Sequence, residues 1–402
     1  MERINPHPFS LTTTSELANV LGWLMAATIA LIGLDEFTLN IGIMSLKFCM
    51  VPMGIALGLY GLNVFVGGRL HLPRNIPAVI FLVYVLFLAS LFYAGMVDSS
   101  ELFTNIRYVD LGPLSSLRKT FNLFMLVTFA YMGARFLTPR QLRWGALGLL
   151  ACQVAVASYC IWLLLHGDLK GLWWNTNGTP KLVLAGDGTP ANQMAGMWLM
   201  AAMLLMLLRV HGRGPVWDWL WILLALAGGA TVMSRSNLVG GALLFFSYAF
   251  KRPRPVTVFA TIAVAMALFL VSIVRGADSL NDASALSRLT FWATSINNFI
   301  HNFPLGSSMG TDPAPHSVWI QLLSETGLPG IVLALSAIAW TFLDRSPSLG
   351  RSAQVAAILF LPYLPYLSVD IPLLQWQTWC IPIAAALAFR HLIPEAPEPL
   401  PA

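Results

Sequence analysis

The run IPAVIFLVYVLFLASLFYAGMV, residues 76–97, decides the fold class of this chain because it contains no charged residue. A helix needs about 20 consecutive apolar residues to cross the hydrocarbon core of a bilayer. Residues 76–97 are long enough to do so, and we interpret them as a transmembrane helix.

The rest of the chain has a matching composition. Of its 402 residues, 57% are hydrophobic and only 10% are charged, compared with about 25% in an ordinary soluble domain. The mean hydropathy of +0.71 likewise argues against a water-soluble globular enzyme. We predict an all-α polytopic membrane protein, a single domain over residues 1–402, with twelve transmembrane helices at 17–34, 41–66, 76–97, 120–137, 144–166, 191–208, 217–233, 237–250, 256–274, 328–343, 353–368 and 372–388.

The distribution of positive charge sets the expected orientation, since Lys and Arg near span ends concentrate on the cytoplasmic side. Assigning alternate loops inward from Met1 makes every inward loop basic. The first run lacks a small-residue cleavage site, so we expect a retained helix and both termini in the cytoplasm. The inward Lys and Arg residues are Arg3, Arg69, Arg74, Arg135, Arg140, Arg143, Arg209, Arg213, Lys251, Arg252, Arg254, Arg345, Arg351 and Arg390.

Neither nucleic-acid binding nor a disulfide or metal site finds support in the sequence. The net charge of +5 is spread singly and forms no basic stripe, which argues against nucleic-acid binding. The four cysteines lie in apolar runs and form no CxxC pair, so we expect neither a disulfide framework nor a zinc site. No acidic DxD metal-binding motif is present, and we expect no metal and no cofactor.

The longest outward segment, residues 275–327, is predicted to contain two helices. Its apolar residues recur at helical spacing with polar residues between them, which indicates an amphipathic helix at the membrane interface that ends at 304–306. A second helix is expected to begin near His316, to end at Gly327 and to be followed by Pro329 in the first turn of the next span. The recurring apolar residues are Leu289, Trp292, Ile296, Phe299, Ile300 and Phe303.

Two outward arginines need a reason for their placement. Arg235 lies in a tight hairpin between runs 217–233 and 237–250, where an arginine near mid-membrane costs about 2.5–3.5 kcal/mol. Such a residue requires a partner, a polar cavity or a side chain that reaches the interface. Arg288 is expected at the start of the amphipathic helix, where the free amides and the guanidinium suit a phosphate; contact with lipid headgroups is the alternative.

His316 is the best-constrained outward histidine because it follows Asp-Pro-Ala-Pro. An imidazole can take a proton from a sugar hydroxyl near neutral pH; an ordinary surface histidine is the alternative interpretation. Glu325 lies nine residues later, on the opposite face of a straight helix, and is expected to anchor a neighbouring segment. Asn192 stands at the start of the sixth span, and Arg107, Arg118 and Lys119 are interpreted as contacts to lipid headgroups.

The order and spacing of these residues resemble those of the O-antigen ligase and O-antigen polymerase family of bacterial envelope glycosyltransferases. The resemblance covers about residues 186–343 and includes the long loop. Four stretches carry it: Ser234 with Arg235; Arg288, Trp292, Pro304, Leu305, Gly306 and Gly310; His316, Glu325, Gly327, Leu328, Pro329 and Gly330; and Asn192 with Ala195.

The resemblance implies a twelve-span inner-membrane enzyme related to the C-type glycosyltransferases, working on the periplasmic face without metal or nucleotide sugar. The donor would be a glycan linked to undecaprenyl pyrophosphate. Arg235 and Arg288 would bind the pyrophosphate, and His316 would be the catalytic base in an inverting transfer. Lys181 stands near the position of an arginine that many ligases carry, with different spacing, and is assigned as a third phosphate contact. Asn192, Glu325 and Trp292 are assigned supporting roles.

Three functions remain open at this point. A ligase transfers a finished chain to a lipid A-core sugar, and the compact loop with the single His316 favours it. A polymerase extends a growing O-antigen, capsule or exopolysaccharide by the same chemistry. A transporter of this size usually has two related halves and ionisable sites near the midplane. Apart from Lys47, this chain shows neither feature.

Overall fold

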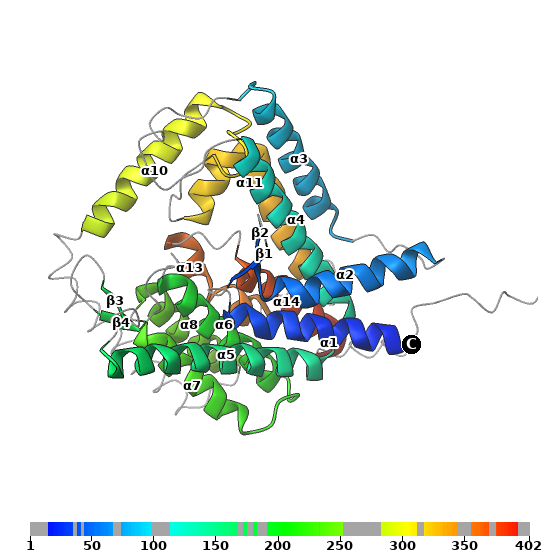
Figure 1. Ribbon diagram of the computed structural model, residues 1–402, viewed down its shortest axis with the longest axis vertical. Coiled ribbons are helices and arrows are strands. Elements are labelled where there is room, and N and C mark those ends of the chain that lie inside the picture. Colours follow the sequence, from blue (N-terminus) through cyan, green and yellow to red (C-terminus); the bar gives the residue numbers. More distant parts are fainter. Residues whose placement is uncertain are drawn as a thin grey trace, which may run out of the picture.

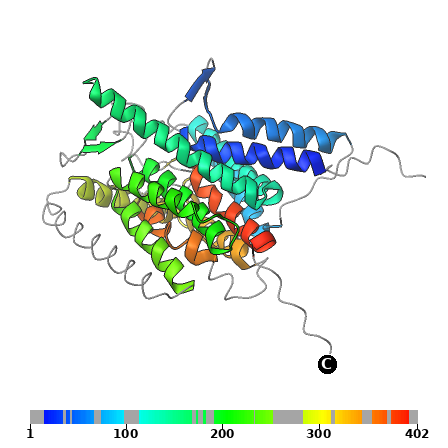
Figure 2. The same cartoon turned by 90° about the horizontal axis from the view of Figure 1, so that it is seen from below.

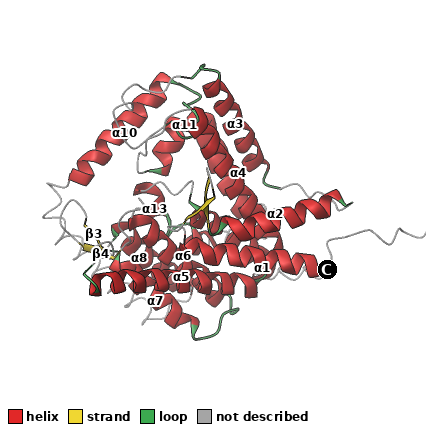
Figure 3. Cartoon of the chain, in the orientation of Figure 1, coloured by secondary structure: helices red, strands yellow, loops and turns green. Residues whose placement is uncertain are grey.

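The computed structural model describes the chain in segments that together cover most of its apolar runs. The predicted span at 256–274 lies outside the described residues, as does His316. Figures 1 and 3 show that the described part is predominantly helical. The described segments are 15–34, 38–41, 44–66, 74–97, 113–167, 172–174, 180–182, 191–232, 234–251, 283–311, 317–343, 355–369 and 375–392.

Five described helices are long and apolar enough to cross a membrane, which confirms the membrane-protein class: Glu16–Leu34, Ile76–Tyr93, Pro139–Leu165, Gln193–Val210 and Val318–Leu343. The count of twelve stays a prediction. The helices are α1 (Ser15–Leu31), η1 (Ile32–Leu34), α2 (Met50–Phe65), α3 (Ile76–Tyr93), α4 (Pro113–Phe136), α5 (Pro139–Leu165), α6 (Ala191–Val210), α7 (Asp218–Thr231), α8 (Arg235–Lys251), α10 (Ala283–His301), α11 (Val318–Leu343), α13 (Leu364–Val369), η5 (Trp376–Trp379), α14 (Cys380–Leu387) and η6 (Ala388–Leu392).

The described part is helical, as predicted, apart from two short antiparallel hairpins. β1 (Thr38–Ile41) pairs with β2 (Met44–Lys47), and β3 (Leu172–Trp174) pairs with β4 (Pro180–Leu182). The expected span at 41–66 is therefore wrong at its start, because the helix begins only at Met50. Pro52 explains this, since proline is tolerated in the first turn of a helix but not in its interior.

The helix α6 forms the centre of the fold. Of its 18-residue span, 94% is buried, because α5, α7 and α8 pack around it. The other four candidate spans are only 22–44% buried, and their outer faces carry exposed apolar side chains. An outer surface of this kind suits lipid rather than water. Figures 1 and 2 show α1 and α2 side by side at the edge of this group.

Arginines cluster at one end of the helix group. The Arg390 guanidinium donates to the carbonyl oxygens of Arg135 and Leu137, and Arg213 donates to the carbonyl oxygen of His391. Burial, together with the nearby charges of Arg390 and Arg213, lowers the pKa of His391. We call this the arginine end; seven of the arginines expected in inward loops lie there: Arg74, Arg135, Arg140, Arg143, Arg209, Arg213 and Arg390.

An ion pair joins α5 to α7 at this end. Both Nε and Nη2 of Arg143 donate to the Asp218 carboxylate, with the shortest distance 2.7 Å from Nη2 to Oδ1. Asp218 is fully buried, whereas the Arg143 side chain is 22% exposed. Removing Arg143 is therefore expected to cost more stability than removing Asp218. Without its partner, Arg143 can still contact water, whereas the buried Asp218 carboxylate cannot.

We predict that Arg143→Met lowers the free energy of unfolding by about 3–5 kcal/mol, since it leaves a buried carboxylate without its cation. Asp218→Asn should cost less, and the double variant should recover part of the loss. Thermal unfolding of the purified protein in detergent measures all three. Arg140→Met, an exposed arginine on the same helix, is the control. Equal midpoints for Arg143→Met and Arg140→Met would contradict this assignment.

Candidate functional site

Two of the stretches that carry the resemblance meet in one backbone contact. The loop after α10 lies against the middle of α11: Ser307 N donates to Ser324 O at 3.0 Å, and Ser308 N donates to Glu325 O at 2.8 Å. Leu328 N donates back to Pro304 O at 3.1 Å. Residues 304–311, here called the crossing loop, are thereby hydrogen-bonded to α11. Figure 1 shows α10 at the edge of the helix group, with α11 beside one of its ends.

Glycine makes this contact possible at two places. Gly327 has φ 63° and ψ −164°, a conformation that is almost restricted to glycine, and it breaks α11 into two halves. Gly306 has φ +83°, and a Cβ there would lie 2.5 Å from Gly327 N. The predicted helix end at Gly327 is confirmed, with Pro329 just inside the second half. Any side chain at either glycine would push the two segments apart.

The Glu325 carboxylate binds the crossing loop to α11. Its Oε1 accepts the Gly310 N–H at 2.6 Å, and its Oε2 accepts from Gln321 Nε2 at 3.0 Å. Glu325 is fully buried, so its polar atoms must be satisfied by the protein. The carboxylate therefore fixes Gly310, six residues before His316, in place.

A buried polar cluster links α10 to both segments. Asn298 Nδ2 donates to Ser307 Oγ at 2.7 Å and to Ser324 Oγ at 2.9 Å. The Ser307 hydroxyl also bonds the Thr311 hydroxyl. These four side chains are each at most 1% exposed, so every bond in the cluster replaces one that water would otherwise make. The cluster fixes the rotation of α10 about its own axis.

Helices α3 and α4 support the crossing loop from the other side. Tyr84 OH lies 2.8 Å from Leu305 O and 3.1 Å from Thr326 O, so it touches both crossing segments. Ser116 Oγ lies 2.9 Å from Ser308 Oγ, and Lys119 Nζ donates to Gly310 O at 3.4 Å. α4 begins at Pro113 and carries Lys119 against the loop, so Lys119 has a partner within the protein; its contact with lipid headgroups stays a prediction.

The other predicted site residues fall at the margins of the described part. Arg235 is the first residue of α8 and follows a three-residue connection from α7, which confirms the tight hairpin. Arg288 lies in the second turn of α10, since that helix begins at Ala283. The helix therefore starts five residues before Arg288, earlier than predicted. Lys181 lies in β4 and Asn192 in the first turn of α6.

The side chains of Arg235, Arg288, Lys181 and Asn192 lie outside the described part of the structure. Trp292 is half-buried on α10, and its indole nitrogen is buried without a hydrogen-bond partner among the described residues. His316 directly precedes Ser317, which is 3% exposed, and Thr311 on the other flank is 1% exposed. Both ends of the segment that carries His316 are thus held in the protein interior.

Comparison with known proteins adds no assignment. No protein-family model matches the chain, and no curated protein is found to be similar. Within the described segments, no three His, Cys, Asp or Glu residues lie close enough to hold a metal ion. The site is therefore defined by its own geometry and by the motif residues quoted above.

Sequence reasoning missed the residues that build the polar cluster. Asn298 is one of the polar residues between the apolar positions of the predicted interfacial helix, yet it is fully buried. A signal was available in the adjacent serines Ser307 and Ser308, which follow a glycine and can bond buried backbone groups. No signal in the sequence pairs Tyr84 with residues more than 200 positions away.

We predict that Gly327→Ala destabilises the protein by at least about 1–3 kcal/mol, because alanine strains the backbone at this φ and ψ. Gly58→Ala is the matched control: it lies in α2 with no atom within 4 Å of the added Cβ. There, alanine should be neutral or stabilising. Thermal unfolding of both variants in detergent provides the comparison, and equal midpoints would show that the contact at Gly327 is dispensable.

Proposed function

We propose that this protein is a membrane glycosyltransferase of the O-antigen ligase type, which moves a glycan from undecaprenyl pyrophosphate to an acceptor sugar hydroxyl. The observation that carries the proposal is the contact between the crossing loop and α11. Gly306, Gly310, Glu325 and Gly327 belong to two separate stretches of the resemblance, and they meet in one buried contact. A resemblance by chance gives no reason for such residues to converge.

The proposed chemistry needs a fixed base and a cationic site. The acceptor hydroxyl attacks the anomeric carbon, the bond from that carbon to the pyrophosphate oxygen breaks, and His316 takes the hydroxyl proton. Arg235, Arg288 and Lys181 bind the pyrophosphate and stabilise the charge that develops on it. Inversion at the anomeric carbon follows from a single displacement. The undecaprenyl pyrophosphate leaves as an anion, and neither a metal ion nor a cofactor enters the proposed step.

The structure supports this assignment through positioning. Glu325 and the polar cluster fix the crossing loop as far as Thr311, and Ser317 directly precedes α11, so the described chain on both sides of the His316 segment is fixed. A base held in this way loses less freedom when the acceptor binds. The indole N–H of Trp292 and the side chain of Asn192 are proposed to support the bound donor.

The proposed topology has twelve spans in a bacterial inner membrane, both termini in the cytoplasm and the active site in the periplasm. The gathering of seven described arginines at one end supports an inward arginine end. The crossing loop accepts a hydrogen bond from Lys119, and its described hydrogen bonds involve none of those seven arginines. We therefore propose that the crossing loop faces outward.

A polymerase would use the same residues with a growing polysaccharide as acceptor. The two functions differ only in the acceptor. The ligase is preferred because the loop that carries His316 is compact, and the experiment below separates the two by the strain in which activity returns.

We predict that the wild-type chain restores a glycan ladder on lipid A-core in a bacterial strain that lacks its own ligase and supplies a matched donor glycan. His316→Ala should abolish the ladder while the protein still inserts into the membrane. His301→Ala, an exposed histidine at the end of α10, is the control and should retain full activity.

The outcomes distinguish the candidates. Restoration only in a strain that lacks its repeat-unit polymerase would identify a polymerase. Full activity of His316→Ala would overturn the assignment of the base. No change of glycan in either matched strain would contradict a transferase and favour a membrane transporter.

A further inference from the structure

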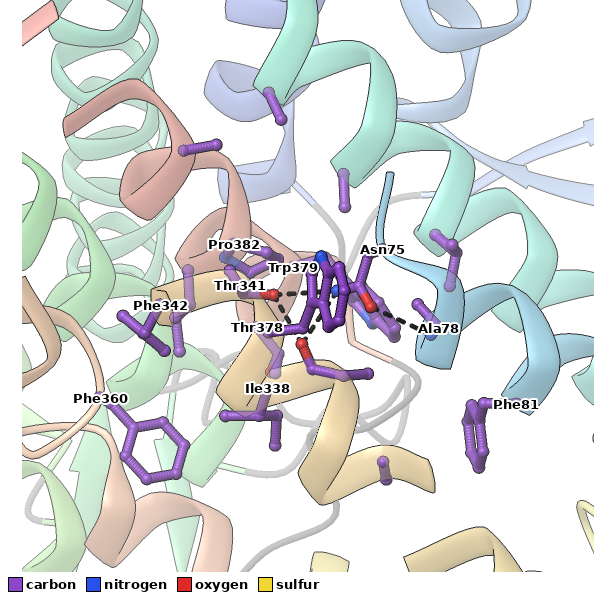
Figure 4. Close-up of a pocket in the computed structure, with 18 of the residues that line it drawn as sticks. Asn75, Ala78, Phe81, Ile338, Thr341, Phe342, Phe360, Thr378, Trp379 and Pro382 are labelled. Carbon is purple, nitrogen blue, oxygen red and sulfur yellow. Dashed lines mark hydrogen bonds between the residues drawn. The ribbon is translucent and has the colours of Figure 1, made fainter. Parts of the chain in front are cut away.

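A cavity of about 260 Å³ lies between α3, α4, α11 and the carboxyl-terminal segments. Its lining is almost wholly apolar, and Figure 4 shows Phe81, Ile338, Phe360 and Pro382 around it. None of the residues assigned to the glycan transfer lines it. The volume is close to the lower end of the range for small-molecule pockets, about 300–1,000 Å³.

One end of the cavity is polar and belongs to the arginine end. Asn75 caps α3 by accepting from Ala78 N at 3.1 Å, and its Nδ2 donates to Ala337 O at 2.9 Å and to Thr341 Oγ1 at 3.2 Å. The dashed lines of Figure 4 mark these bonds. They join the start of α3 to the end of α11 at the polar end of the cavity.

Arg74 directly precedes Asn75 and is the one charged residue among the described residues that line the cavity. It is exposed, so its guanidinium is accessible from outside the bundle. An apolar cavity of this kind does not hold ordered water well, because water needs polar partners there. A ligand with an apolar chain and an anionic group at the Arg74 end matches both the apolar lining and the positive charge of Arg74.

We propose that this cavity binds an anionic phospholipid, with part of one acyl chain inside and the headgroup phosphate on Arg74. Basic pockets between transmembrane helices are known to select anionic headgroups. The apolar lining accepts a lipid tail, and the arginine end lies where headgroups gather if the helices span a bilayer. The proposal does not depend on the transferase function, because it uses a separate set of residues.

Native mass spectrometry of the purified full-length protein tests the proposal. The protein is stripped of lipid in detergent and titrated with phosphatidylglycerol or phosphatidylcholine of the same chain length. We expect one retained phosphatidylglycerol, with affinity above that for phosphatidylcholine. Arg74→Gln should weaken phosphatidylglycerol binding about fivefold, corresponding to about 1 kcal/mol per cation, and should leave phosphatidylcholine binding unchanged.

Two further variants separate this site from general surface attraction. Arg213→Gln removes an exposed arginine at the same end that does not line the cavity, and it should bind phosphatidylglycerol like the wild type. Ala130→Trp fills the cavity and should weaken binding of both lipids. Thermal unfolding confirms that each variant is folded; if Ala130→Trp is not, Ala337→Leu is a smaller filling at the same cavity.

Three results would overturn the proposal. The first is equal binding of the two lipids to the wild type. The second is an equal loss for Arg74→Gln and Arg213→Gln, which would indicate non-specific attraction. The third is selective retention of a polyprenyl phosphate over phosphatidylglycerol, which would assign the cavity to a different lipid. None of these results depends on glycan transfer.

Discussion

The break in α11 at Gly327 is the constraint on which the described structure depends. A helix interrupted within an apolar bundle exposes backbone amides and carbonyls that no water can reach, and each would cost several kcal/mol if left unpaired. The crossing loop supplies the missing partners through Pro304, Ser307 and Ser308. Because these bonds need the loop to approach within backbone distance, the positions of α10 and of the loop itself follow from the break.

The helices α3 and α11 connect the crossing loop to the arginine end. Tyr84 touches the crossing segments, and Asn75 holds the end of α11, nine residues earlier on the same helix. Nine residues of helix span about 14 Å. A rigid pair of helices of this length joins the candidate site to the cavity at the arginine end. Lipid bound at Arg74 would therefore stabilise the same pair of helices that supports the crossing loop.

The parts that sequence patterns predicted are those governed by local rules. Long apolar runs gave the helices, and the Gly327 and Pro329 pair gave the break in α11. The predicted start of α10, at Arg288, lies about five residues after the observed start at Ala283, because helix ends carry weak signals in the sequence. The buried position of Asn298 could not be predicted, since a polar residue on an amphipathic helix ordinarily faces water. Only the tertiary contacts with Ser307 and Ser324 reverse that expectation.

The residues of the resemblance therefore divide into two groups by physical role. Gly306, Gly310, Glu325 and Gly327 are required by the geometry of the crossing, whatever reaction the protein performs. The side chains of Arg235, Arg288 and His316 lie outside the described part, and the proposed function assigns them by their chemistry toward a pyrophosphate and a hydroxyl. A chain that kept only the first group would keep the crossing but would lack the residues that the proposed transfer needs. The proposed function requires both groups, because the crossing fixes the loop that leads to His316 and the second group supplies the base and the cations.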